Sequence, residues 1–380
     1  MKTADREVQA MPDRRTRRAR LRVALAALAA LGAIAAFPSA RAVAQSIPDH
    51  LTDQQFWTMI ADFSEPNGYF HSDNLVSNET AFQWVIPALQ RTIQPGGVYL
   101  GVGPDQNFTY IAALKPRISF IVDIRRGDLQ ELLMYKALIA LAADRAEFLS
   151  LLFSRPRPPG LDTASTADAI LTALYTRSAP DRAMYAKTLA AIKDQLVNVH
   201  GWTLTAEDAE GIEYVFNAFY AAGPWLTYTN NGGGGLPGMP GYADLQMESD
   251  GLGVQRSYTA TEANFRTLKD LEARNLIVPL VGNFAGPKAL RAVAQYLVTT
   301  HATVSAIYVS NVEQYLFMQG DDWSRYYTNV ATLPIDSTSV FIRSIPAGMG
   351  GPIQYRGQAS SALCSVAALD KAFAAGAIRG

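Results

Sequence analysis

The sequence has little cysteine and little histidine. Among its 380 residues there is one cysteine, Cys364, and there are four histidines. A single thiol cannot form an intramolecular disulfide, and these few residues show no zinc-ligand spacing. We therefore expect neither a disulfide scaffold nor a metal site. The Gly-x-Ser-x-Gly, P-loop and His-Glu-x-x-His motifs are also absent, so no motif supports a hydrolase or a metalloprotease.

Charged residues are scarce, at 18% of the chain. The 33 basic and 34 acidic residues nearly cancel over the whole chain, but the N-terminus is basic. Residues 1–44 hold nine basic and three acidic residues, and the remainder carries a net charge of −7. A fifteen-residue apolar run, 23–37, follows the basic stretch and precedes Ala42-Val43-Ala44. This pattern predicts a cleaved signal peptide over 1–44 and a secreted or periplasmic protein. An uncleaved anchor, or a start codon assigned too far upstream, is the alternative.

The charge of the remaining chain limits its partners. An acidic chain without clustered Lys and Arg lacks the phosphate-neutralising groups that nucleic-acid binding needs, so no nucleic-acid partner is expected. No later run approaches eighteen apolar residues, so no stable membrane span is expected after signal cleavage. The sequence indicates no oligomeric state.

Short apolar runs alternate with longer helical patterns along residues 45–380. Strands are predicted at 98–100, 118–122, 276–281, 304–309 and 339–342. Helices are predicted at 54–63, 79–92, 128–153, 180–198, 206–222, 259–273 and 287–300, with Asp128 as an N-cap. Pro279 assigns the third strand to a sheet edge or a bulge. We expect one α/β domain with a helical insertion at about 155–200 and a glycine-rich loop at 230–241.

The segment 98–126 carries the most informative pattern. A predicted strand runs into Gly101-Val102-Gly103, and a short helix and a second strand ending in Asp123 follow. Glycines at such a turn let the backbone approach a ligand, and an acid at the end of the next strand can accept both hydroxyls of a ribose. The 22 residues between Gly101 and Asp123 are close to the spacing of about twenty expected for that acid. The alternative is a structural strand-to-helix turn.

This segment resembles the first βαβ unit of the Rossmann-like, S-adenosylmethionine-dependent methyltransferases. Residues 45–380 as a whole resemble a family of uncharacterised exported bacterial proteins with that type of fold. The resemblance implies a doubly wound, mainly parallel sheet and an S-adenosylmethionine-like ligand. It places Gly101 and Gly103 under the amino-acid part of the ligand and Asp123 on its ribose. Asp105 and Asn107 stand where the family has a third glycine, and Tyr99-Leu100 replaces the usual acid before the loop.

Two further loops follow predicted strands and carry Asn283 and Asn311. Ligands bind outside the carboxyl ends of parallel strands, so these side chains are predicted to share a crevice with the glycine loop. Helix capping is the alternative for both. The polar segment 64–80 precedes the first strand and, by analogy with methyltransferases, brings Asn74, Asn78 and Glu79 to the crevice. Glu79 and Glu313 are the candidate general bases.

Two functions from different classes remain open. The first is an exported protein that binds a small nucleotide-like or polar metabolite, with catalysis undecided and methyltransferase-like chemistry as one option. The second is a non-enzymatic envelope or interaction protein that retains the fold. Export weighs against methyl transfer, because S-adenosylmethionine is made and held in the cytosol. A nicotinamide enzyme is a weaker third option, because the third glycine of its fingerprint is missing.

Overall fold

The computed structural model describes residues 46–230, 234–235, 238–345 and 360–379. All of the described residues belong to one compact unit, which spans Ala44–Gly380. The predicted signal peptide, 1–44, lies outside the described residues, and so does part of the predicted glycine-rich loop 230–241.

The described residues form a six-stranded sheet with the order β5-β2-β1-β6-β7-β8. Neighbouring strands pair in parallel except for β8, which runs antiparallel to β7. The strands are β1 (Val98–Gly101), β2 (Ile118–Asp123), β5 (Ile277–Val281), β6 (Val304–Ser310), β7 (Ile335–Ile345) and β8 (Ser360–Ser365). A separate two-residue ribbon pairs β3 (Thr229–Asn230) with β4 (Gly234–Gly235). The fold is α/β and Rossmann-like, as predicted.

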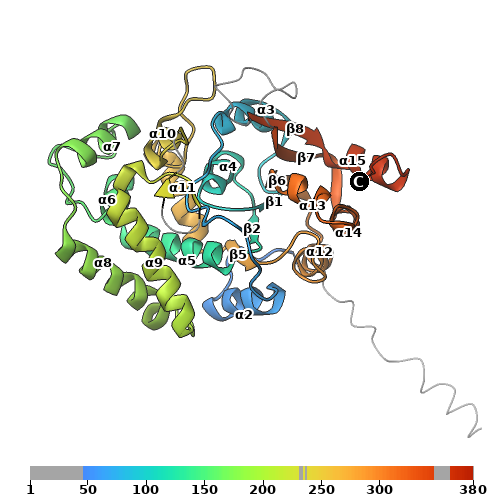
Figure 1. The fold of residues 1–380 in the computed structure, drawn as a ribbon, viewed down its shortest axis with the longest axis horizontal. Coiled ribbons are helices and arrows are strands. Elements are labelled where there is room, and N and C mark those ends of the chain that lie inside the picture. Colours follow the sequence, from blue (N-terminus) through green and yellow to red (C-terminus); the bar gives the residue numbers. More distant parts are fainter. Residues whose placement is uncertain (1–45, 231–233, 236–237, 346–359, 380) are drawn as a thin grey trace, which may run out of the picture. The chain divides into compact units, whose positions relative to one another are not determined.

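Helices cover both faces of this sheet (Figure 1). The chain moves from β1 to β2 to β5 through α4 (Gln106–Leu114) and α5 (Arg126–Leu141), and returns to β6 through α12 (Ala289–Thr299). Right-handed crossovers that run in opposite directions place their helices on opposite faces. Contacts agree, because α4 and α5 both pack on α11 (Glu262–Ala273), whereas α12 packs on α2 (Asp53–Phe63) and α14 (Asp322–Val330).

The remaining helices surround these layers. The 3-10 turn η1 (Phe82–Val85) and α3 (Ile86–Thr92) precede β1 in the chain, and η1 packs on β8. Further along the chain, α13 (Val312–Phe317) follows β6 and α15 (Val366–Ala374) follows β8. Between β2 and β5 the chain forms α6 (Arg145–Leu152), α7 (Ala167–Thr176), α8 (Arg182–Asp194), the π turn η2 (Gln195–Val199), α9 (Ala206–Ala222), η3 (Gly223–Trp225) and α10 (Tyr242–Met247).

The sheet core follows from residue type. Every residue of β1, β2 and β5 is buried, as continuous apolar parallel strands covered by helices must be. The strand that contains Pro279 is an edge strand, β5, which confirms the inference from proline. The register between β6 and β7 shifts between Tyr308 and Ser310, so the carboxyl end of β6 is irregular.

Three sequence predictions need correction. The helix expected over 128–153 is two helices, because Asp144 caps a new helix by accepting a 2.9 Å hydrogen bond from the Glu147 amide. Asp128 is not an N-cap but is buried in the first turn of α5. The helix expected from residue 79 begins later, because Ala81 adopts a left-handed φ of 60°. The edge strand β8 was not predicted, because its mixed small and polar residues lack strand periodicity.

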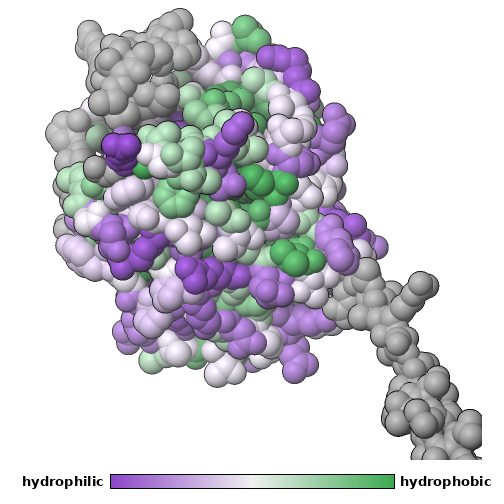
Figure 2. Space-filling view, turned by 90° about the vertical axis from the view of Figure 1, so that its right-hand side faces the viewer, coloured by the Kyte–Doolittle hydropathy of each residue, from purple (hydrophilic) through white to green (hydrophobic). Residues whose placement is uncertain are grey.

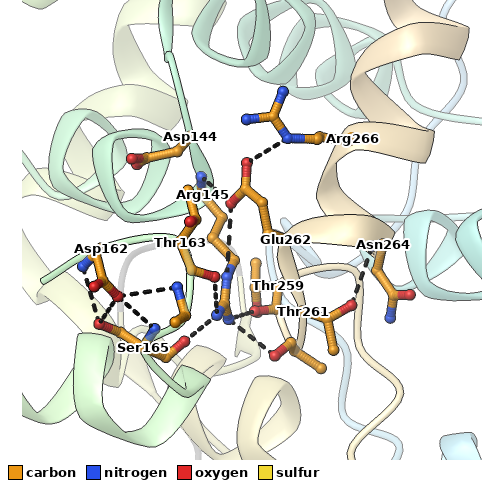
Figure 3. Close-up of polar contacts among 12 residues, drawn as sticks. Asp144, Arg145, Asp162, Thr163, Ser165, Thr259, Thr261, Glu262, Asn264 and Arg266 are labelled. Atoms are coloured by element: carbon orange, nitrogen blue, oxygen red, sulfur yellow. Dashed lines mark hydrogen bonds and ion pairs between the residues drawn. The ribbon is translucent and has the colours of Figure 1, made fainter.

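The predicted insertion, 155–200, contains α7 and α8. Arg145, at the start of α6, joins the chain before α7 to the chain before α11 (Figure 3). Its Nη1 atom donates to the carbonyls of Thr259 and Ala260 at 2.7 and 2.9 Å, and its Nη2 atom donates to the Ser165 carbonyl. A single buried guanidinium thus satisfies several backbone carbonyls and fixes the insertion to the helical layer.

The exposed surface mixes residue types. The face at the right of Figure 1 intersperses hydrophilic and hydrophobic residues, and its hydrophobic patches are small (Figure 2). No helix in the described part of the chain is both long enough and apolar enough to cross a bilayer.

Candidate functional site

A pocket opens at the carboxyl ends of four parallel strands. Its lining includes Gly103 after β1, Asp123 at the end of β2, Asn283 after β5, and Asn311 after β6. The segment before η1 supplies Asn74 and Asn78 to the same pocket. Segments far apart in the sequence therefore meet at one place, because parallel strands end on the same edge of the sheet. The other lining residues are Tyr69, Phe70, Ser77, Val102, Pro104, Gln106, Ile124, Arg125, Tyr228, Gly282, Phe284, Tyr308, Ser310, Val312, Tyr315, Leu316 and Gln319.

Gly103 forms the turn between β1 and α4. Its φ is 76°, a left-handed conformation that residues with a side chain rarely adopt. Any other residue at this position would strain the backbone. A Cβ atom added here would lie 3.3 Å from the Asn74 Nδ2 atom. The turn and the segment before the first strand therefore approach each other closely across the pocket.

Three residues predicted to bind a cofactor do not line the pocket. A Cβ atom at Gly101 would lie 1.9 Å from the Asn107 Oδ1 atom, so that glycine makes room for Asn107. Asn107 itself accepts from the Tyr99 hydroxyl at 2.8 Å and donates to the carbonyls of the glycine turn. Asp105 faces Tyr258 and Gln246 in the interior. The role of these residues is to brace the turn from behind, and the expectation that they contact a ligand is corrected.

Asp123 reaches the pocket but already has a strong partner. Its Oδ1 atom accepts from the Arg125 backbone amide at 2.9 Å and from Nε at 3.0 Å, and its Oδ2 atom accepts from Nη2 at 3.1 Å. Burial alone would lower the pKa of Arg125, but the carboxylates of Asp123 and Asp128 more than offset this and raise it. A carboxylate offers about four acceptor positions. Three are used, so one position on Oδ2 is free for a ligand in this arrangement.

Carboxamides are the most frequent polar side chains in the lining. Asn74, Asn78, Asn283 and Asn311 come from three separate segments, and all are partly exposed. Within the described residues, no hydrogen bond forms to the side chains of Asn74 and Asn78, which leaves both free to donate and accept. Asn311 occupies the N-cap position of α13 without a side-chain capping bond, so capping does not explain it.

Asn283 has a structural contact as well as a place in the pocket. Its Oδ1 atom accepts from the Ala285 amide at 2.9 Å. The capping function expected for this loop is instead supplied by Glu65, a remote residue, whose Oε1 atom accepts from the amides of Lys288 and Ala289 at 2.8 Å each. The Glu65 Oε2 atom accepts from the Asn283 amide at 3.1 Å, so Glu65 holds the whole loop in place.

Aromatic rings stand beside these polar groups. Phe70 and Tyr315 pack edge to face with ring centroids 5.0 Å apart, and Tyr69 is 79% exposed. Exposed rings next to carboxamides can stack on planar or sugar-like ligands. The sequence signal for this wall was the polar and aromatic character of residues 64–80. Tyr228 flanks the glycine-rich loop 230–241, and nothing in the sequence showed that Tyr315 would join the wall.

The two candidate bases lie in different places. Glu313 accepts from Arg343 Nη2 at 2.5 Å and from the Tyr327 hydroxyl at 2.8 Å, outside the pocket, so the general-base assignment for it is corrected. Glu79 is 2% exposed and does not line the pocket either. It does accept a hydrogen bond from the hydroxyl of Ser310, which does line it. Burial raises the pKa of Glu79, and hydrogen bonds led by that of Ser310 partly offset the effect.

Sequence reasoning missed Arg125 and Ser310. Arg125 lies two residues after Asp123, the spacing that puts two extended residues on the same side of the chain, and that spacing is a usable signal. Ser310 is the first residue of the polar loop 310–313 that follows the predicted strand, but the sequence assigned it no role of its own. The described residues contain no group of three or more His, Cys, Asp or Glu side chains that could hold a metal ion.

The described residues thus form a Rossmann-like α/β domain with a polar pocket at the carboxyl edge of its sheet. A family model described as a domain of unknown function, DUF7790, matches residues 74–363. The match covers well over half of the chain, and the protein therefore belongs to this family. No curated protein matches the chain. The matched region begins at Asn74, in the pocket wall, and includes all four strand ends that line the pocket.

Proposed function

We propose that this protein binds a small, polar, uncharged metabolite of nucleoside-like chemistry in the pocket at the carboxyl edge of the sheet. The observation that carries the proposal is the convergence of polar side chains from four strand ends and from the segment before β1. Buried or half-buried carboxamides with open hydrogen-bond positions favour ligands that present hydroxyls, amides or heteroaromatic edges.

Charge narrows the ligand class. Of the lining residues that the structure describes, Arg125 is the one cation and Asp123 the one anion, and they bind each other. No excess positive charge faces the pocket, so phosphate groups gain little there. The aromatic wall adds a stacking surface for a planar base or a sugar face. Uncharged nucleosides and related polar metabolites fit this combination better than nucleotides do.

From the resemblance to methyltransferases, the proposal keeps the nucleoside-like ligand but not the methyl-transfer reaction. Strand order and the position of Asp123 support a nucleoside-like ligand. A ribose held through both hydroxyls needs two acceptor positions on that carboxylate, whereas Arg125 leaves one. The residues present therefore do not fit the ribose clamp of S-adenosylmethionine enzymes, and we derive no methyl-transfer step.

Export is the second part of the proposal. The basic and apolar pattern of residues 1–44 supports a signal peptide and a secreted or periplasmic location. In that location a ligand other than cytosolic S-adenosylmethionine is expected. Fractionation of cells that produce the full chain, with sequencing of the new N-terminus, tests this part. A chain that begins at Met1 in the cytosol would contradict it.

Thermal-shift and calorimetric titrations test the ligand class. The purified chain is titrated with adenosine, S-adenosylhomocysteine, S-adenosylmethionine, NAD and AMP. An uncharged nucleoside at 100 times its Kd should stabilise the protein by about 2.7 kcal/mol, and AMP should bind more weakly. Asn78→Ala should weaken binding about tenfold or more, because it removes an uncharged carboxamide that can both donate and accept a hydrogen bond.

Asn198→Ala is the matched control, because Asn198 is exposed in η2 and bonds to Asp194. It should bind like the unmodified chain. If none of the probes binds, the proposal fails, and the non-enzymatic interaction protein becomes the better explanation.

A further inference from the structure

Ser310 has an unusual backbone conformation for a serine. It is the last residue of β6, and α13 begins two residues later. Its φ is 49°, in the left-handed region, and the register with β7 shifts at this point. A non-glycine residue in this region is strained, and such strain is concentrated at functional sites.

The turn places the Ser310 hydroxyl group between the pocket on one side and the buried carboxyl of Glu79 on the other. Ser310 lines the pocket, and its Oγ atom donates a hydrogen bond to Glu79 Oε1. A sharp strand-to-helix turn that projects a serine into a pocket is the geometry of a nucleophile elbow, although the Gly-x-Ser-x-Gly sequence is absent. The register with β7 shifts between Tyr308 and Ser310, and such irregular strand ends are frequent next to active sites.

Glu79 is suited to accept a proton from this hydroxyl. It is buried behind Ser310 and does not itself line the pocket. Burial raises the pKa of its carboxyl, which makes the carboxylate a stronger base than an exposed one. A buried base that hydrogen-bonds a pocket hydroxyl is the arrangement that activates serine nucleophiles.

We propose that Ser310 is a catalytic nucleophile and Glu79 its general base, and that the protein transfers or hydrolyses acyl groups of small polar esters. The inference rests on the pocket of the proposed function and adds a reaction to it. Asn78 and Asn311 also line the pocket, and Asn311 Oδ1 accepts from Ser310 Oγ at 3.4 Å. We assign the amide N–H groups of these two side chains as donors to the oxygen that becomes negatively charged.

The reaction is balanced by these two residues and water. Ser310 Oγ attacks the ester carbonyl carbon, an O–C bond forms, and the hydroxyl proton passes to Glu79. The bond to the leaving alcohol breaks, and Glu79 returns the proton to the alcohol oxygen, which shares the acyl carbon with Ser310 Oγ and so lies beside the Glu79 carboxyl. Water then attacks the acyl carbon and gives a proton to Glu79. The bond between Ser310 Oγ and the acyl carbon breaks, and Oγ takes the proton back from Glu79. The carboxylic acid is released, and no oxidant or reductant is needed.

A fluorophosphonate probe tests the nucleophile directly. The purified full chain is incubated with the probe, and intact-mass and peptide mass spectrometry measure the adduct. We expect one phosphonyl adduct per chain, located on Ser310, and slow hydrolysis of p-nitrophenyl acetate with a burst of about one equivalent. Ser310→Ala should remove both. Glu79→Gln keeps a hydrogen-bond acceptor but no base, and should slow labelling by about a hundredfold or more.

Ser305→Ala is the matched control, because Ser305 lies on the same strand and donates to the Val98 carbonyl instead. It should label like the unmodified chain, and thermal unfolding of each variant shows that it is folded. Adduct on another residue, no adduct, or equal labelling of Glu79→Gln would overturn the proposal. Nucleoside binding without labelling leaves the proposed function intact, whereas labelling without nucleoside binding refutes the proposed ligand and supports the nucleophile.

Discussion

Asp105 should make the protein less stable as the pH rises towards neutrality. Its side chain is buried behind the glycine turn, where Oδ2 accepts from the Tyr258 hydroxyl at 2.9 Å and from Gln246 Nε2 at 3.1 Å. Burial raises the pKa of Asp105 from 3.8 to about 7, and the Tyr258 hydrogen bond only partly offsets it. The folded protein therefore keeps the carboxyl protonated at pH values where the unfolded chain has lost the proton.

The sign and size of the effect follow from linkage. Between pH 3.8 and about 7 the folded state binds one more proton at this site than the unfolded state does. Each pH unit of increase in that window then lowers the free energy of unfolding by about 1.4 kcal/mol. From pH 5 to pH 7 the loss from this group amounts to about 2 kcal/mol, because half of the folded molecules are already ionised at the upper end. Buried Glu79 and Glu131, whose pKa values are also raised by burial, act in the same direction.

Urea denaturation at pH 5, 6 and 7 measures this effect when the chain is compared with Asp105→Asn. Asparagine has the shape of the protonated acid and does not titrate, so the variant should gain about 2 kcal/mol relative to the unmodified chain between pH 5 and pH 7. Asp62→Asn, at an exposed position on α2, should leave the difference constant. If the Asp105→Asn difference is equally flat across the three pH values, the carboxyl is ionised in the folded protein and the reasoning is wrong.

Three further substitutions test the loop that holds Asn283 and a buried ion pair in the interior. Glu65→Ala removes the acceptor for three loop amides, so the free energy of unfolding should fall by about 1–3 kcal/mol in urea denaturation; an unchanged midpoint would contradict this. Gly282→Ala would place a Cβ atom 2.3 Å from that of Ala289, so it should destabilise by about 1–3 kcal/mol and weaken nucleoside binding in calorimetry. Lys136→Met leaves Glu272 without its 3.1 Å partner in the interior, and thermal unfolding should show a loss of about 3–5 kcal/mol. A loss below about 1 kcal/mol would mean that the Glu272 carboxyl is neutral in the folded protein.

The sequence predicted the location of the site better than its contacts. Asp123, Asn283 and Asn311 were placed at strand ends, and parallel strands bring their ends to one edge whatever the loops do. That inference needs only the strand boundaries, which continuous apolar runs mark clearly. The edge position of β5 followed from one proline, because an internal strand would need the N–H group that proline lacks.

Side-chain direction could not be predicted in the same way. Asp105 and Asn107 lie within four residues of Gly103, yet the first turn of α4 points both into the interior, and helix periodicity does not fix where the first turn begins. Glu313 faces Arg343 because β7 lies next to β6, which is a tertiary fact. The same limit hid Arg125, whose guanidinium turns back onto Asp123.

The sheet order explains why the proposed nucleophile lies where it does. The chain adds strands outward from β1 to β2 and β5, and then reverses to place β6 on the other side of β1. Loops after β1 and β6 leave the sheet towards opposite faces, so a crevice opens between them. Gly103 borders that crevice from one side and Ser310 from the other. Glu79 reaches Ser310 from the segment before β1, which passes over the same opening. A reactive hydroxyl at this reversal is open to a ligand in front and held by a buried acid behind, and no other strand end in the described sheet combines both contacts.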